Sequence, residues 1–325
     1  MSFGSIIGQE RAKKMLQNGL RLGRTSHAYI FSGPSGTGRR EMAFALAKAI
    51  FCTERTDDAC GHCLECRKVE HGNHPDLHYV QPDGTSIKIE QIRNLQKEFA
   101  YRATASQSKI YILTEAEKMT VQAANSLLKF LEEPQSAVVA ILISENGHAL
   151  LPTIQSRAQW IPFQPLPPQM MADLLEKEGH SQVLVRSAVH LAAGIDACRE
   201  IIQLNWFAEI RNVMIQLVKE CITRFAAALI TAQQKVFKTN LAEHIDTLLQ
   251  LFVLWFKDMV HIQSGRQDSI VFVDQSEWMA KHAFSRELSY WVGCMEKALE
   301  LTKRLKFHVN PQLAFEQFVI DIQGG

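Results

Sequence analysis

The chain has 325 residues, of which 46% are hydrophobic and 21% are charged. These proportions are typical of a soluble globular protein of two or three domains, and they exclude disordered and collagen-like classes. With 35 basic and 34 acidic residues, the net charge of +1 excludes a protein that binds nucleic acid by bulk charge alone. A local basic face is still compatible with this balance.

Neither a membrane span nor a secretory signal is visible in the sequence. No stretch reaches the ~18 apolar residues that a span needs, and the first ten residues lack a basic segment followed by an apolar run. We therefore expect a cytoplasmic protein. The seven cysteines are odd in number, and four of them lie between residues 52 and 66. That spacing favours a metal site in a reducing compartment over a disulfide framework.

Helical and strand signals alternate through the first half of the chain. Hydrophobic spacing predicts helices over residues 9–22, 41–51, 89–101 and 123–131. Short apolar runs predict strands over residues 27–32, 77–80, 110–113, 137–143 and 160–163. Strands that alternate with helices favour an α/β fold with a mostly parallel sheet and helices on both faces.

The pattern of alternating helix and strand signals ends at residues 164–168, where three prolines mark a linker or domain boundary. From residue 169 onward only helices are predicted. Three short helices fit before about residue 206, and longer ones follow, such as 241–263 and 285–305. The second half is therefore expected to be all-helical.

A glycine-rich turn joins a predicted strand to a predicted helix and reads Gly33-Pro-Ser-Gly36-Thr-Gly38-Arg39-Arg40. This is the context of a P-loop, in which backbone N–H groups and a helix N-terminus face a phosphate. In the working motif, Lys and then Ser or Thr follow the last glycine, and the hydroxyl binds Mg²⁺. Arg39 could still face a phosphate, but Arg40 has no oxygen with which to bind the metal. Gly33, Gly36, Gly38 and Arg39 are thus candidates for a vestigial nucleotide loop.

A second part of the magnesium site is also altered. In P-loop hydrolases, the strand that corresponds to residues 110–113 ends with Asp-Glu. The Asp supports Mg²⁺ and the Glu orients the attacking water. This chain has Thr114 and Glu115 at these two positions. Two independent changes favour a P-loop fold that has lost hydrolysis. A plain strand-to-helix turn, and a working ATPase in which Arg39 replaces the lysine, are the alternatives.

The pattern C-x7-C-x2-C-x2-C is formed by Cys52, Cys60, Cys63 and Cys66. A C-x2-C step places two thiolates close enough to share a tetrahedral zinc ion, and four thiolates leave no position for water. We therefore expect a structural Zn²⁺ site. Either of two nearby histidines, His62 and His71, could replace a thiolate. The alternative to a metal site is four reduced cysteines without metal.

Several segments carry a resemblance when they are taken together. They are residues 26–33 (SHAYIFSG), the cysteine module, residues 74–76 (HPD), 124–134 (ANSLLKFLEEP), 150–157 (LLPTIQSR) and 310–313 (NPQL). The combination resembles bacterial DNA polymerase III clamp-loader subunits over nearly the whole chain. It implies an AAA+ P-loop domain over residues 1–163 with a zinc module inserted at about 52–66, a helical lid over 164–206 and a helical collar for oligomerisation over 207–325.

The resemblance also implies a role. Within the family, the lost lysine and the lost aspartate favour the delta-prime type over the gamma/tau type, which normally keeps both. A delta-prime subunit joins three gamma/tau subunits and delta in a pentamer that opens the beta sliding clamp and places it on primed DNA. ATP would be bound by the partner subunits, and no independent catalysis is expected here. A catalytic gamma/tau-type ATPase and a stand-alone DNA-binding zinc protein are the alternatives.

The resemblance further implies an arginine finger at Arg157, within Ser156-Arg157-Ala158, where the family has Ser-Arg-Cys. An arginine presented to a neighbour's γ-phosphate stabilises the charge that develops during transfer, and such a finger contributes ~10³–10⁵ in rate. The alternative is a solvated loop arginine, or one that pairs with a carboxylate on its own surface.

Two weaker signals have simpler interpretations. Ser144 and Asn146 stand where the family has a sensor residue, and we interpret them as strand-end hydrogen-bonding groups. Arg93, Lys97 and Arg102 fall on or just after one predicted helix and could meet DNA phosphates. A solvated charged face is the preferred interpretation of these three residues.

Overall fold

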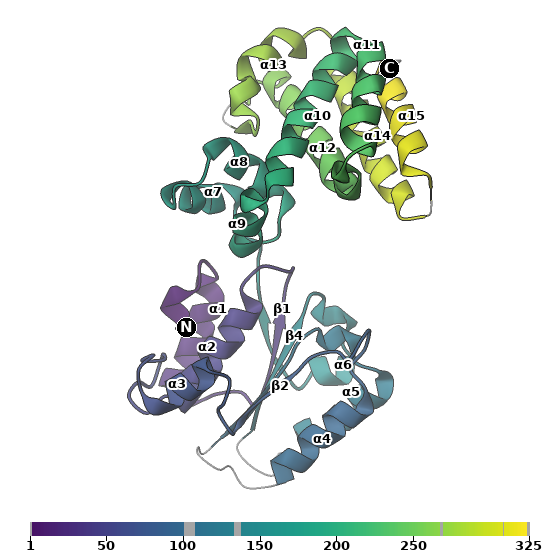
Figure 1. Cartoon of the computed structure of the whole chain (residues 1–325). Helices are drawn as coiled ribbons and strands as arrows, with labels where there is room; N and C mark the ends of the chain where they lie inside the picture. The colour runs from purple at the N-terminus through teal and green to yellow at the C-terminus, as the bar shows by residue number, and fades with distance from the viewer. Residues whose placement is uncertain (1, 101–107, 133–137, 267–268, 308, 324–325) are drawn as a thin grey trace. The chain divides into compact units, whose positions relative to one another are not determined.

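The computed structural model describes residues 2–100, 108–132, 138–266, 269–307 and 309–323 (Figure 1). The chain forms two compact units, Met1–Leu166 and Pro167–Gly325. The expected boundary between a lid and a collar, after residue 206, falls inside the second unit and stays a prediction. The segments singled out in the sequence analysis include five residues outside the described ranges: Tyr101, Arg102, Glu133, Pro134 and Ala137.

The first unit is built on a parallel five-stranded sheet in the order β2-β3-β4-β1-β5, as the alternation of elements predicted. The strands are β1 (Ala28–Ser32), β2 (Leu77–Val80), β3 (Lys109–Leu113), β4 (Val138–Ser144) and β5 (Gln159–Pro162). In register, Ser32 lies beside Ser144 and Leu113 beside Leu142. The carboxyl ends of β1, β3 and β4 therefore meet at one edge of the sheet.

Both faces of the sheet are covered by helices (Figure 1). In the first unit these are α1 (Glu10–Arg21), α2 (Arg39–Phe51), α3 (Leu64–Glu70), α4 (Ile89–Ala100), α5 (Val121–Glu132) and α6 (Pro152–Gln155). Four of them lie close to predicted bounds, although α2 begins at Arg39 rather than at residue 41. The helices α3 and α6 were not predicted, because seven and four residues are too few for a clear helical repeat.

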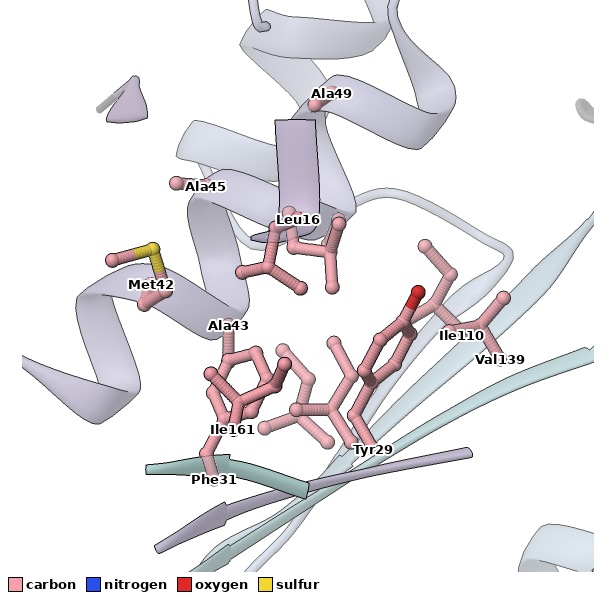
Figure 2. Close-up of a cluster of buried hydrophobic side chains, with 14 of the residues drawn as sticks. Leu16, Tyr29, Phe31, Met42, Ala43, Ala45, Ala49, Ile110, Val139 and Ile161 are labelled. Atoms are coloured by element: carbon pink, nitrogen blue, oxygen red, sulfur yellow. The ribbon is translucent and has the colours of Figure 1, made fainter. Parts of the chain in front are cut away.

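The hydrophobic core lies on the two sides of the sheet, because successive strand side chains point in opposite directions. In β1, Tyr29 and Phe31 join the cluster that includes Leu16 of α1 and Ala43 of α2 (Figure 2). Ile30 belongs to the opposite cluster, with side chains of α4, α5 and α6. Burial on both faces explains the unbroken apolar runs of the central strands.

The second unit is all-helical over its described residues, which confirms the expected fold class. Its α-helices are α7 (Pro168–Lys177), α8 (Gln182–Leu191), α9 (Ile195–Gln203), α10 (Asn205–Thr223), α11 (Phe225–Thr231), α12 (Ile245–Gln263), α13 (Ser276–Ala283), α14 (Leu288–Leu305) and α15 (Pro311–Gln323). A π-helix spans Ala232–Phe237, and the helix predicted from residue 241 starts instead as a 3-10 turn, Asn240–His244. Among the described residues, no helix combines the length and apolar character needed to cross a membrane.

A buried carboxylate fixes the segment that follows α12. Asp258 has no exposed surface, and its Oδ2 accepts hydrogen bonds from the backbone N–H groups of Val271 and Phe272, both at 2.9 Å. Beside it, Arg211 of α10 lies over the Phe272 ring, 5.1 Å from its centroid, and pairs with Asp274. Burial raises the pKa of Asp258 to about 7, although the two backbone donors act against this change.

We expect the Asp258→Asn variant to remove a pH dependence of stability. Because the folded-state pKa is raised, the carboxyl's contribution to stability is fully present below pH ~4 and is lost as pH rises through about 7. The free energy of unfolding of the variant, relative to the natural chain, should therefore rise by about 2–3 kcal/mol between pH 5 and pH 8. Urea unfolding of the full chain at several pH values measures this difference, and a difference that is flat with pH would contradict it.

Candidate functional site

The glycine turn that follows β1 has the geometry of a phosphate loop. A Cβ on Gly33 would lie 2.3 Å from the carbonyl oxygen of Phe163, so no larger residue fits there. Gly36 and Gly38 have φ angles of 71° and 81°, in the left-handed region that glycine adopts without strain. Gly38 directly precedes Arg39, the first residue of α2, so the loop leads into a helix N-terminus.

This loop borders a cavity of about 400 Å³ at the carboxyl ends of the strands. Such an edge is where parallel α/β sheets bind ligands. The cavity lining contains Gly36, Gly38 and Arg39 from the predicted nucleotide loop, together with Thr114 and Glu115. The structure thus brings together the two sequence segments in which the magnesium motif is altered.

Carboxylates lie near Arg39, the residue at the lysine position of the P-loop pattern. Arg39 is 9% exposed, and its Nη2 lies 3.8 Å from Oε1 of Glu145, which follows β4. Its Nη1 is buried and makes no hydrogen bond with any described residue. Burial lowers the pKa of Arg39, while the charges of Glu145, Glu117 and Glu41 act to raise it. The pairing with Glu145 could not be read from the sequence, which separates the two residues by more than 100 positions.

The other altered positions are engaged with their own surroundings. The guanidinium of Arg40 lies over the ring of Tyr79, 5.2 Å from its centroid, as a cation–π contact. The Thr114 backbone N–H donates to the carbonyl of Val80 at 2.9 Å. Glu115 pairs with Lys118, and this hydrogen bond raises the pKa of Lys118. The Arg40 side chain has no oxygen, and the hydroxyl of Thr114 donates to the carbonyl of Val80 at 3.4 Å.

The four predicted zinc ligands come together in the structure. The sulfur atoms of Cys52, Cys60, Cys63 and Cys66 all lie within 4.8 Å of one another. Tetrahedral Zn–S bonds of about 2.3 Å require sulfur separations of about 3.8 Å, and Sγ of Cys60 lies 4.0 Å from Sγ of Cys66. The backbone N–H groups of Cys63 and Cys66 donate to the sulfurs of Cys60 and Cys63 at 3.2 and 3.4 Å. The donor set and its spacing therefore fit a zinc ion.

The cysteine module is tied to the body of the first unit. Oδ1 of Asp58 accepts a hydrogen bond from the N–H of Phe3 at 3.0 Å, and Asp57 pairs with Arg21 of α1 at 2.6 Å. Cys52 directly follows α2, so the module continues from the helix that starts at the glycine loop. The four-sulfur group includes neither of the two alternative ligands: His62 is exposed, pairs with Glu54 and lies with it within 4.8 Å of the Cys60 sulfur, and His71 directly follows α3.

Arg157 is presented by a short, well-anchored turn. Ile154 of α6 is fully buried, and the Gln155 side-chain amide donates to the carbonyl of Leu150 at 2.7 Å. The Arg157 side chain is 37% exposed, and its Nη2 lies 2.7 Å from Oε1 of Glu132, the last residue of α5. In the free chain the arginine is thus paired on its own surface, which is one of the arrangements considered from the sequence.

The weaker candidates differ in their surroundings. Ser144 is fully buried, and its backbone carbonyl accepts a hydrogen bond from the N–H of Gly33 at 3.2 Å. Its side-chain Oγ is buried and makes no hydrogen bond with any described residue, so the structure gives no support to the interpretation of this side chain as a hydrogen-bonding group. Asn146 Oδ1 accepts a hydrogen bond from the N–H of His148 at 3.2 Å. Arg93 and Lys97 are exposed on α4. These contacts give no separate indication of a sensor or of a DNA-binding surface.

A glycine-rich strand-to-helix turn on a parallel five-stranded sheet, followed by an all-helical unit, is consistent with an AAA+ module and a helical C-terminal domain. The family model described as "DNA polymerase III, delta subunit" matches residues 8–167. The chain is 38% identical over 320 residues to DNA polymerase III subunit delta' of Bacillus subtilis (strain 168), which covers 98% of this chain and 97% of that relative. The chain belongs to the delta-prime family of DNA polymerase III subunits.

Other relatives match less of their own length or at lower identity. DNA polymerase III subunit tau of Bacillus subtilis is 34% identical over 177 residues, which are 54% of this chain and 31% of the relative. Among solved structures, a DNA polymerase III gamma subunit-related protein of Thermotoga maritima has 17% identity and a TM-score of 0.45, with 97% of this chain and 98% of that chain covered.

Proposed function

We propose that this chain is a non-hydrolysing subunit of the clamp-loader complex and that it supplies Arg157 to ATP bound on a neighbouring subunit. One observation carries the proposal: the loop keeps its glycine geometry, yet Arg39, at the lysine position, is paired with Glu145. Because Glu145 offsets the charge of Arg39 while the fold is retained, we infer that this chain acts as a structural and regulatory member of an ATP-driven assembly.

The chemistry of the cavity opposes hydrolysis. A P-loop enzyme relies on Mg²⁺ to neutralise charge on the β- and γ-phosphates. Arg40 offers no metal ligand, and Glu115, at the position of the water-orienting carboxylate, is paired with Lys118. Four glutamates line the cavity and would repel an anionic triphosphate; they are Glu41, Glu115, Glu117 and Glu145. We therefore infer that nucleotide binding here is weak and that turnover is absent.

Family membership supports the choice of partners. We infer that gamma/tau and delta subunits assemble with this chain in the cytoplasm, and that the complex, rather than this chain alone, engages the beta sliding clamp and primed DNA. A net charge of +1 agrees with a subunit that depends on its partners for DNA contact.

The cysteine module is proposed to hold one structural Zn²⁺. Cys52, Cys60, Cys63 and Cys66 would provide four thiolates and leave no open coordination position. Such a metal would close the loop between α2 and α3. It would take no part in phosphate chemistry.

We expect no Mg²⁺-dependent ATP turnover from the isolated chain, and the Arg39→Lys variant should not create it. A lysine would restore one phosphate contact, but Arg40 and Thr114 would still leave Mg²⁺ without its hydroxyl and carboxylate supports. Steady-state phosphate release from purified chain measures this directly. Robust turnover by the single variant would contradict our account of the metal site and would support the gamma/tau-type alternative.

The proposed function is tested by rebuilding the complex from purified subunits. ATP turnover stimulated by the clamp and primed DNA is measured with this chain present and with it omitted. The proposal expects stimulation to depend on the chain even though the chain alone shows no turnover. Equal stimulation without the chain would remove it from the loading reaction.

A further inference from the structure

The arginine proposed as the finger is already held by a carboxylate of its own chain. Nη2 of Arg157 lies 2.7 Å from Oε1 of Glu132, a distance typical of a charge-assisted hydrogen bond. On its other side, Nη1 donates to the carbonyl of Thr153 at 3.0 Å and lies 3.4 Å from Oγ of Ser156. Both ends of the guanidinium fork are therefore engaged within the free chain.

A triphosphate would have to compete for these donors. An arginine binds a phosphate best when its planar fork presents two parallel N–H groups, and Glu132 occupies one end of that fork. The carboxylate also cancels the charge that a finger must present to the transition state. An arginine that stays paired with Glu132 is thus a poor finger, and its release is a condition for its action.

The pair is exposed enough to be opened by a neighbour. The side chains of Arg157 and Glu132 are 37% and 49% exposed. Exposed ion pairs of this kind shift an equilibrium by only about 1.5- to 5-fold, because solvent screens them. The γ-phosphate carries more charge than a single carboxylate, so it can displace Glu132 without any rearrangement of the fold.

We propose that Glu132 is a latch that holds Arg157 on its own surface until the triphosphate of the adjacent subunit displaces it. This inference rests on the proposed function of Arg157. Glu132 is a positioning residue in this proposal, because it touches neither the nucleotide nor the reacting phosphate. Its position at the end of α5, on an element different from the α6 turn, lets the two groups separate while each element stays in place.

The test uses four variants in the rebuilt complex. Glu132→Gln keeps the shape of the side chain and removes its charge, and Arg157→Ala removes the finger. The double variant reports whether the first change acts through the second, and Glu90→Gln removes an exposed carboxylate from α4 as the matched control. ATP turnover is measured at low and high ionic strength, in the absence and the presence of clamp and primed DNA.

We expect Glu132→Gln to raise unstimulated turnover at the one partner site that Arg157 faces by up to about 5-fold at low salt, so that total turnover rises by a smaller factor. The increase should shrink as salt rises, because the pair that the variant removes is screened. The increase should be absent in the double variant and in Glu90→Gln. Turnover that falls in Glu132→Gln, or that stays unchanged while Arg157→Ala loses activity, would overturn the latch and leave the finger intact. Unchanged turnover in Arg157→Ala would instead overturn the proposed function.

Discussion

Replacement of Arg157 by alanine should abolish most ATP turnover at the one partner site that this arginine faces, by about 10³-fold or more. The other sites would keep the arginines of their own neighbours, so total turnover should fall only in part. Clamp loading should fall further, because it requires the sites to act together. Steady-state ATP turnover and clamp loading in complexes rebuilt with the natural chain or the variant provide the measurement.

The structure predicts that this variant folds normally. The Arg157 side chain is 37% exposed, and the buried Ile154 anchors the α6 turn without it. Arg157→Lys should rescue poorly, since an ammonium cannot reproduce the planar contact. Arg24→Ala, which removes an exposed arginine from the same unit, is the matched control. Unchanged clamp loading by Arg157→Ala would show that Arg157 has no part in the reaction and that the chain has only a structural role in the complex.

Replacement of Cys63 by serine should empty the metal site of purified protein, from about one zinc per chain to almost none. Structural zinc sites in small peptides contribute about 10–16 kcal/mol of apparent binding free energy, so the module should lose its fold without the metal. None of the four cysteines belongs to the two clusters that cover the sheet. The rest of the first unit should therefore stay folded while the segment over residues 52–66 becomes sensitive to protease.

Metal analysis and limited proteolysis check this expectation. Cys221→Ala, a change at a buried cysteine of α10 in the second unit, is the control and should retain its zinc. A natural chain that is fully folded, metal-free and reactive at all four thiols of the module would show that the site is not a zinc site.

Local features of this chain could be predicted from the sequence because their causes are local. Apolar runs such as the one in β4 are consistent with a strand buried on both faces. The glycines at 36 and 38 adopt left-handed φ angles that other residues avoid. The two C-x2-C steps place sulfurs close together over a few residues. The short helices α3 and α6 were not predicted, because seven and four residues are too few to show a clear helical periodicity.

Only the tertiary structure decided which charged groups meet. The sequence placed Arg39 in a phosphate loop and Arg157 in a finger motif, but it could not assign Glu145 to the first or Glu132 to the second. Each pair joins two elements whose proximity depends on strand order and on the packing of helices against the sheet. Hydrophobic periodicity specifies which face of an element is buried and leaves open which neighbour covers it. The Arg39–Glu145 and Arg157–Glu132 ion pairs are therefore properties of the folded chain.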